Sequence, residues 1–253
     1  MITDPWFYAA AVPAMVILGL GKAGFSSIGV LIIPLMSLAI SPIQAVGIVL
    51  PVFLLSDIVA VVSYRRSFDR DLLKVMLPGA VVGAGIGWIT AAAAGEDFIR
   101  ILVGALSLLV AWLYWRRRHD MPPPQERSVA KGLFFSAAGS FTSFVTHAGA
   151  APFQMYVGPL RLPPPVFAGT AVYFFAATNL LKVVPYFYLG QFSAANLLTA
   201  ATLIPIAIPA TFFGIWLIRR VDTARFYDVI YTLIIIVGVF LIWQGVNGLA
   251  SPI

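Results

Sequence analysis

Two interruptions of the apolar sequence hold the residue types that could do chemistry in this chain. The first covers residues 19–29 and carries four glycines, with Lys22 among them. Each glycine costs about 1 kcal/mol relative to alanine inside a helix, so a helix is expected to break here. A broken helix offers backbone N–H groups and helix N-termini that attract anions, and the lysine adds a full positive charge. The segment therefore predicts an anion-binding site.

A second interruption covers residues 147–152 and begins with His147. Its imidazole is either a ligand or proton-handling group, or a satisfied interior histidine. Further polar side chains lie inside a later apolar region, at residues 178–182. We expect the substrate-binding residues to be Gly21, Lys22, Ala23, Gly24, Ser26, His147, Gly149, Thr178, Asn179 and Lys182.

The charged candidates each allow a second interpretation. Lys22 either contacts the substrate, or snorkels or neutralises Asp57 instead. Asp57 is the only acidic residue well inside an apolar span, and it is either a structural partner of Lys22 or a coupling site for a proton or a monovalent cation. Lys182 lies six residues before Tyr188, so its side chain could reach the membrane surface. Because ionisable residues within a span usually mark function, Lys22 is the first choice.

The composition argues against a soluble protein. Of 253 residues, 60% are hydrophobic and 10% charged, whereas soluble domains carry about 25% charged residues. Apolar runs of about 20 residues recur and suffice to cross a bilayer. The chain is therefore expected to be an all-α polytopic membrane protein whose environment is the lipid bilayer. The basic residues behind its net charge of +6 lie mostly in short loops between the spans. This distribution indicates how the chain is oriented in the membrane and argues against nucleic acid as a partner.

Enzyme chemistry has little support in this sequence. There are two histidines and no cysteine, and neither an HExxH nor a GxSxG motif is present. We expect no catalytic residues, no metal site and no cofactor. The expected partner is a small anionic substrate, and a homo-oligomer is compatible with this interpretation.

The apolar regions form two halves with one plan, an interrupted region followed by three full spans. The first half has residues 6–40, 42–64, 72–94 and 98–115, and the second has 132–160, 164–188, 194–218 and 226–246. Matches recur 122 positions apart, pairing Val46-Gly47 with Ala168-Gly169 and Asp57 with Asn179. We expect a first transmembrane repeat (1–115), a basic cytoplasmic connector (116–131) and a second transmembrane repeat (132–253).

The basic residues predict an inverted arrangement of these repeats. Placing the basic loops in the cytoplasm puts 13 of the 16 lysines and arginines inside, and both termini outside. Residues 132–160 must then enter from the cytoplasm and return to it, although they are too few for two full spans. Each interrupted region is therefore expected to be a re-entrant or broken helical hairpin. The two tips should meet at mid-depth from opposite faces.

These motifs together resemble the sulfite exporter TauE/SafE family. They are the glycine-rich break leading to Pro34, Ala45-Val46-Gly47, the Gly79/Gly83/Gly87 stripe, and in the second half Gly149, Pro152 and Ala168-Gly169-Thr170. The resemblance implies a secondary transporter in the bacterial inner membrane for sulfite, thiosulfate, sulfoacetate or another organosulfonate. An anion channel and a carrier of non-sulfur organic anions are the alternatives.

Overall fold

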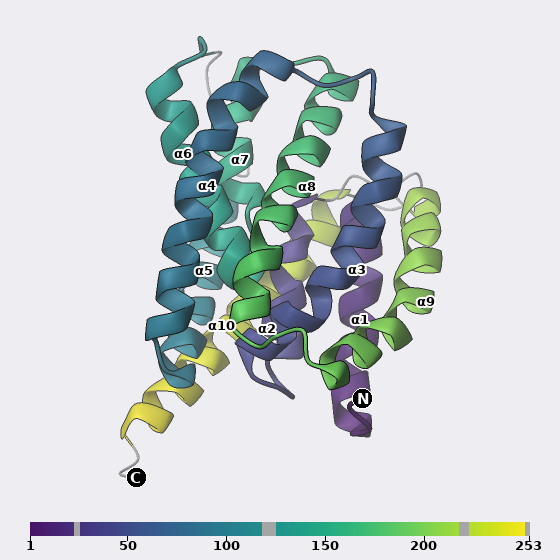
Figure 1. Cartoon of the computed structure of the whole chain (residues 1–253), viewed down its shortest axis with the longest axis vertical. Helices are drawn as coiled ribbons and strands as arrows, with labels where there is room; N and C mark the ends of the chain where they lie inside the picture. Colours follow the sequence, from purple (N-terminus) through teal and green to yellow (C-terminus); the bar gives the residue numbers. More distant parts are fainter. Residues whose placement is uncertain (23–25, 118–124, 218–222, 251–253) are drawn as a thin grey trace.

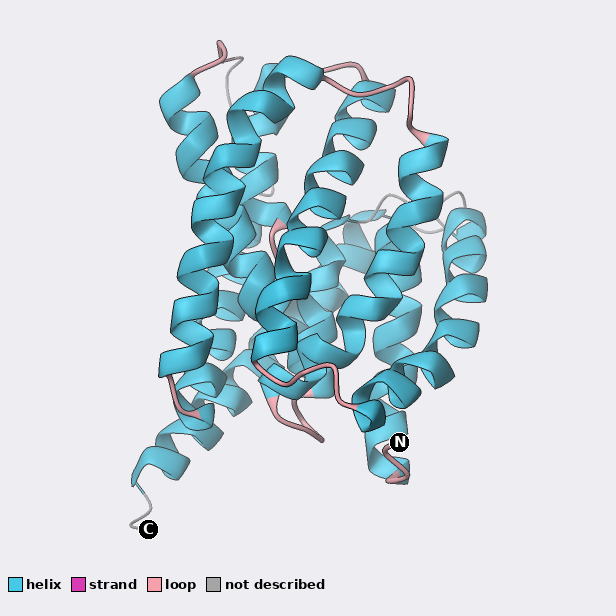
Figure 2. Ribbon diagram, in the orientation of Figure 1, coloured by secondary structure: helices cyan, strands magenta, loops and turns pink. Residues whose placement is uncertain are grey.

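The computed structural model describes residues 1–22, 26–117, 125–217 and 223–250, and in these residues every regular element is helical (Figures 1 and 2). The elements are α1 (Pro5–Lys22), η1 (Ser26–Leu31), α2 (Ile32–Met36), α3 (Pro42–Ser63), α4 (Arg70–Ala93), α5 (Glu96–Arg117), α6 (Val129–Thr146), α7 (Ala150–Val157), η2 (Gly158–Leu160), α8 (Pro164–Tyr188), α9 (Ala194–Leu217) and α10 (Thr223–Ala250).

Among the described residues, five helices are long and apolar enough to cross a membrane. They are Pro42–Ser63, Arg70–Ala93, Glu96–Arg116, Pro165–Tyr188 and Tyr231–Ala250, and two shorter apolar stretches are Pro5–Gly19 and Ala194–Ala210. Large apolar side chains such as Ile89 and Trp243 point out of the bundle, as expected where lipid is the solvent. The expectation of an all-α polytopic membrane protein is confirmed.

Polar caps fix where several of these helices begin. The hydroxyl of Ser41 accepts a hydrogen bond from the backbone N–H of Gln44 at 3.2 Å, at the start of α3. The carboxylate of Asp69 accepts from the N–H of Leu72 at 3.0 Å, at the start of α4. Each cap satisfies an N–H that the first helical turn leaves without a partner. The cap positions thus set the lengths of the apolar spans.

A stripe of glycines lets α4 and α6 pack closely. A side chain at Gly79 or Gly83 would overlap the backbone carbonyls of Leu133 and Ala137 on α6, and at Gly87 a Cβ would lie 2.7 Å from Phe144. Small residues at a helix contact allow the backbones to approach. The stripe is therefore the surface through which α4 packs closely on α6.

A second pair of helices, α1 and α9, also joins the two halves of the chain. Helix α1 packs along α9, where the N–H of Ile2 donates to the hydroxyl of Thr199 at 3.0 Å. Further contacts join α5 to α10, α3 to α8, α3 to α9 and α4 to α8. First-half helices are therefore packed mainly against second-half helices.

The second interrupted region is a helical hairpin whose ends lie together. Helix α6 ends at Thr146, His147 adopts a left-handed conformation (φ 54°), and α7 runs back for eight residues. At 1.5 Å per residue α7 is about 12 Å long, less than half of a bilayer core. The N–H of Gln125, before α6, donates to the carbonyl of Pro159, after α7, at 3.1 Å. The hairpin therefore enters and leaves at one end of the bundle.

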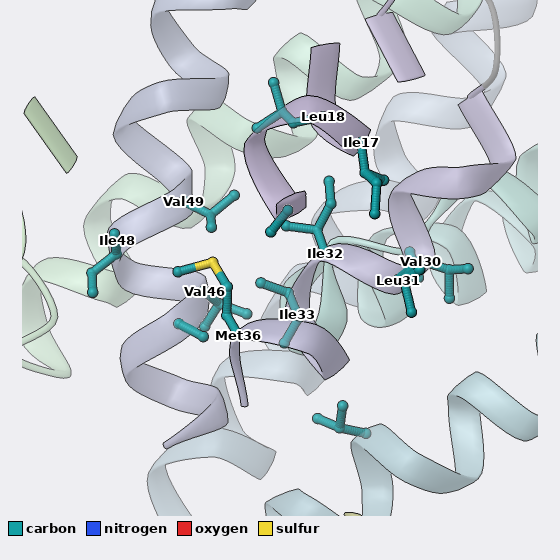
Figure 3. Packing of buried hydrophobic residues seen from close by; sticks show 14 of the residues in the cluster. Ile17, Leu18, Val30, Leu31, Ile32, Ile33, Met36, Val46, Ile48 and Val49 are labelled. Carbon is teal, nitrogen blue, oxygen red and sulfur yellow. The ribbon is translucent and has the colours of Figure 1, made fainter. Parts of the chain in front are cut away.

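The first interrupted region is anchored by the largest hydrophobic cluster. Ile17 and Leu18 of α1, the stretch Val30–Ile33 of η1 and α2, and Val46 and Val49 of α3 interdigitate in its centre (Figure 3). Burial of these side chains holds the end of α1, the end of η1 and the start of α2 together beside α3. The two interruptions are thus brought into the same region of the bundle.

Candidate functional site

Lys182 is the centre of a polar network inside the protein. The side chain comes from α8 and is fully buried. Its ammonium group donates to the Ser143 hydroxyl at 2.8 Å and to the Asn179 side-chain oxygen at 3.0 Å, and it lies 2.9 Å from His147 Nδ1. Snorkelling of Lys182 to the membrane surface is therefore wrong. A lysine is buried only where polar partners offset its lost hydration.

With Lys182 as an ammonium ion, the hydrogen-bond partners assign the tautomer of His147. A lysine ammonium can only donate, so Nδ1 must be the acceptor of the 2.9 Å contact. The hydrogen of the neutral ring then sits on Nε2, which donates to the backbone carbonyl of Val46 at 3.2 Å. His147 thereby links the tip between α6 and α7 to both α8 and α3.

Asn179 connects this lysine to the buried carboxylate of Asp57. Its side-chain amide donates to Asp57 Oδ2 at 2.6 Å while its oxygen accepts from Lys182. Asp57 lies on α3 and Asn179 on α8, and both are 4% exposed. The Asn179 amide therefore bridges the buried ammonium group of Lys182 and the buried carboxylate of Asp57.

A cavity opens beside this network and is bordered by both interruptions. It has about 550 Å³ of space, counting the volume at its mouth. Its walls are formed by Leu18, Gly21, Gly29, Ile32, Phe53, Ser143, His147, Ala150, Phe175 and Asn179. Polar groups from α6, the second tip and α8 thus face apolar side chains from α1, α2 and α3. A small molecule with one polar end would suit this lining.

The start of α7 points to the same cavity. Ala150, the first residue of α7, is part of the wall, so first-turn N–H groups lie near it. Such N–H groups and the helix dipole favour a negative charge. Gly149 lets the start of α7 pack closely against α6 and α8, because a Cβ there would overlap the carbonyl oxygen of Gly139 and press on Phe175. Chemically, the site offers hydrogen-bond donors and positive charge.

The predicted site residues divide into four groups. Gly21, His147 and Asn179 line the cavity, and Lys182 and Asp57 lie behind it in the network. Thr178 is instead buried with its hydroxyl donating to the carbonyl of Phe174 at 2.9 Å, and Gly149 packs against α6. Ala23 and Gly24, and the side chains of Lys22 and Ser26, lie outside the described residues.

Sequence reasoning missed Ser143 and the aromatic walls Phe53 and Phe175. The signal for Ser143 was present, since Ser140, Ser143 and His147 recur at helical spacing on the way to the second break. No comparable signal marks the two phenylalanines among 19 in the chain. Within the described residues, no three His, Cys, Asp or Glu side chains gather as a metal site would require.

Comparison with protein families assigns almost the whole chain. The model of the family described as "Sulfite exporter TauE/SafE" matches residues 9–241. This chain belongs to the sulfite exporter TauE/SafE family. A TauE/SafE protein with these apolar helices is an integral, multi-pass membrane protein of a transporter family for sulfur anions. Searches of the curated proteins and of the solved structures gave no significant match.

Proposed function

We propose that this TauE/SafE protein is a secondary transporter that carries a small sulfur-containing anion across the bacterial inner membrane. Sulfite, thiosulfate, sulfoacetate and other organosulfonates are the candidate substrates. The observation that carries the proposal is the fully buried Lys182 ammonium, hydrogen-bonded to two side chains that line the cavity, Ser143 and His147.

An oxyanion in the cavity would strengthen an arrangement that is already polar. It would accept hydrogen bonds from Lys182 and Ser143 and face the first turn of α7. The apolar side chains of Leu18, Phe53 and Phe175 would contact the rest of the molecule. Binding would therefore replace neutral partners of a buried cation by a negative charge, which is favourable where water is scarce.

We propose that the two halves are inverted repeats. In support, α4 packs on α6 as α9 packs on α1, and α4 packs on α8 as α9 packs on α3, which is the exchange of partners that a two-fold relation between the halves produces. The paired positions Asp57 and Asn179 are hydrogen-bonded to one another. Gly47 contacts Gln191 after α8, while Gly169 contacts Ser67 after α3.

The orientation we propose places the basic loops in the cytoplasm and both termini outside. In support, the start of α1 and the end of α10 lie at one end of the molecule, and the loop between α3 and α4 lies at the other end with the start of α6 (Figure 1). That loop carries Arg65 and Arg66, and the connector carries further arginines. Rocking of one half against the other about the cavity would give each side access in turn.

Flux measurements in proteoliposomes test the function. Vesicles loaded with thiosulfate should take up radiolabelled thiosulfate by counterflow, with saturation, and sulfite and sulfoacetate should compete where acetate and lactate do not. Lys182→Met should lower uptake at least about tenfold, because the buried positive charge is lost. Lys74→Met is the matched control, since Lys74 is exposed and paired with Asp71, and it should transport normally.

Three results would contradict the proposal in different ways. Unsaturable, voltage-driven current without counterflow would indicate a channel. Competition by carboxylates alone would indicate a carrier of non-sulfur organic anions. Normal transport by a folded Lys182→Met protein would remove Lys182 from the site, with a single elution peak on size exclusion as the test of folding.

A further inference from the structure

The ring of His147 can bind a proton only if its contact with Lys182 changes. Nδ1 accepts a hydrogen bond from Lys182, and Nε2 donates to Val46. A protonated imidazole has no lone pair to accept with. Protonation of His147 in this arrangement would therefore remove the acceptor of the Lys182 N–H and place two cations next to one another. Like charges at that separation in a poorly hydrated interior repel strongly.

An oxyanion removes both obstacles at once. His147 and Ser143 line the cavity and both contact the Lys182 ammonium behind them, so an anion that enters between these two side chains would meet the Lys182 N–H that donates to Nδ1. One anion oxygen accepts that N–H, the freed lone pair of Nδ1 takes up a proton from hydronium of the bulk solution, and the new Nδ1–H donates to the anion. Nε2–H stays on Val46 throughout. One negative charge and one positive charge enter together.

We infer that His147 is the proton-binding site of this transporter and that one proton binds there with each oxyanion. The inference rests on the proposed transport function and gives it a coupling ion, so that transport of the anion would move a proton in the same direction. A histidine suits this role because its unperturbed titration range is close to physiological pH.

Among the described side chains, the charged groups around His147 come from two elements. Helix α8 supplies Lys182, and α3 supplies Asp57, which reaches Lys182 through Asn179. Helix α1 ends at Lys22, whose side chain lies outside the described residues. Elements η1, α2 and α7 contain no ionisable carboxylate, lysine, arginine or histidine. Asp57 is thus the competing proton site, and the experiment must separate it from His147.

The pH dependence of anion binding by the purified full-length protein is the first test. Methanesulfonate and thiosulfate are the probes, because both stay ionised across the pH range and bind no proton themselves. Affinity should rise by up to about tenfold per pH unit as the pH falls from about 8 to about 6, because binding takes up one proton. A pH-indicator dye in weakly buffered solution should show that uptake directly.

Substitutions identify which group takes the proton. His147→Asn should bind with little dependence on pH, because asparagine tolerates the left-handed backbone at this position and offers Lys182 an oxygen. His119→Asn, at the only other histidine of the chain, should behave as wild type. Loss of the pH dependence in Asp57→Asn together with its retention in His147→Asn would overturn the assignment.

Nitrogen NMR keeps the inference testable even if His147→Asn fails to fold. In the His119→Asn protein one histidine remains, and its two ring-nitrogen shifts report the protonation state. We expect the neutral form with hydrogen on Nε2 without ligand, and the imidazolium form with methanesulfonate near pH 7. A neutral ring in the complex would refute the inference alone. Absence of anion binding by the wild-type protein at every pH would instead refute the proposed transport function.

Discussion

Lys182 draws its hydrogen-bond partners from three sides, from α6, from the second tip and from its own helix. The partner on its own helix, Asn179, also holds the carboxylate of Asp57. Each side chain in this hydrogen-bonded network therefore depends on its neighbour for its orientation. A substitution at one member should change the orientation of the others. The two predictions at this scale concern such dependence.

Exchanging the two repeat-related residues should be tolerated better than changing one. Asn179→Asp places a second carboxylate where an amide now donates to Asp57 at 2.6 Å, and the repulsion should cost about 3 kcal/mol. Adding Asp57→Asn removes the repulsion and leaves one carboxylate next to Lys182. Thermal unfolding in detergent should show a lower midpoint for the single variant and substantial recovery in the double variant. Equal midpoints for the two would show that the contact does not matter.

Tyr186 should stabilise the tip that carries His147. Its hydroxyl donates to the carbonyl of Phe144 at 2.6 Å, and the side chain is 1% exposed. Tyr186→Phe leaves that carbonyl buried without this donor, which should cost about 1–3 kcal/mol and weaken anion binding. Tyr188→Phe is the control, because Tyr188 is exposed, and its thermal midpoint should match that of wild type. If both variants unfold alike, the Tyr186 hydrogen bond contributes nothing.

The site was predictable from sequence only in part. Polar residues inside apolar segments pointed to His147, Asp57, Asn179 and Lys182, because a lipid environment makes such residues expensive. Sequence could not distinguish a buried Lys182 from a snorkelling one, since the answer depends on Ser143 and His147 of another helix. Contacts between distant parts of a chain leave no mark in the local pattern of one sequence.

At the scale of elements, the close contact between α4 and α6 depends on which face each glycine occupies. Gly83→Ala should destabilise, because its Cβ would overlap the carbonyl of Ala137 and push the helices apart. Gly85→Ala is the matched control two residues away, where a Cβ meets nothing within 4 Å, and alanine there should leave stability unchanged or raise it by up to about 1 kcal/mol. Thermal midpoints shifting in the same direction would contradict this.

Sequence predicted the long helices well and their interruptions less well. Residues 164–188 were expected as a span and form α8 (Pro164–Tyr188), and residues 42–64 correspond to α3 (Pro42–Ser63). Hydropathy works here because every apolar stretch must satisfy its backbone internally and so becomes a helix. The 3₁₀ turns η1 and η2 and the left-handed His147 were not predicted, because they depend on what packs around each break.

For the whole molecule, the proposed orientation gives a labelling pattern. The chain contains no cysteine, so single cysteines can be introduced without removing others. In intact cells, a membrane-impermeant maleimide should label Thr3→Cys, just before α1, and Ala194→Cys, the first residue of α9, because the starts of both helices lie at the end of the molecule that we place outside (Figure 1). Arg66→Cys, at the other end, should be labelled only after the cells are opened. The reverse pattern would invert the proposed topology.

The packing of first-half helices on second-half helices also constrains how the protein is made. Helix α4 finds its glycine-matched neighbour only after α6 has been synthesised, and α1 waits until α9 emerges near the end of translation. Newly inserted first-half helices must therefore remain in the membrane with polar groups such as Asp57 lacking their final partners. A chain stopped after residue 115 would keep those surfaces exposed, which makes it a substrate for membrane quality control rather than a stable half-protein.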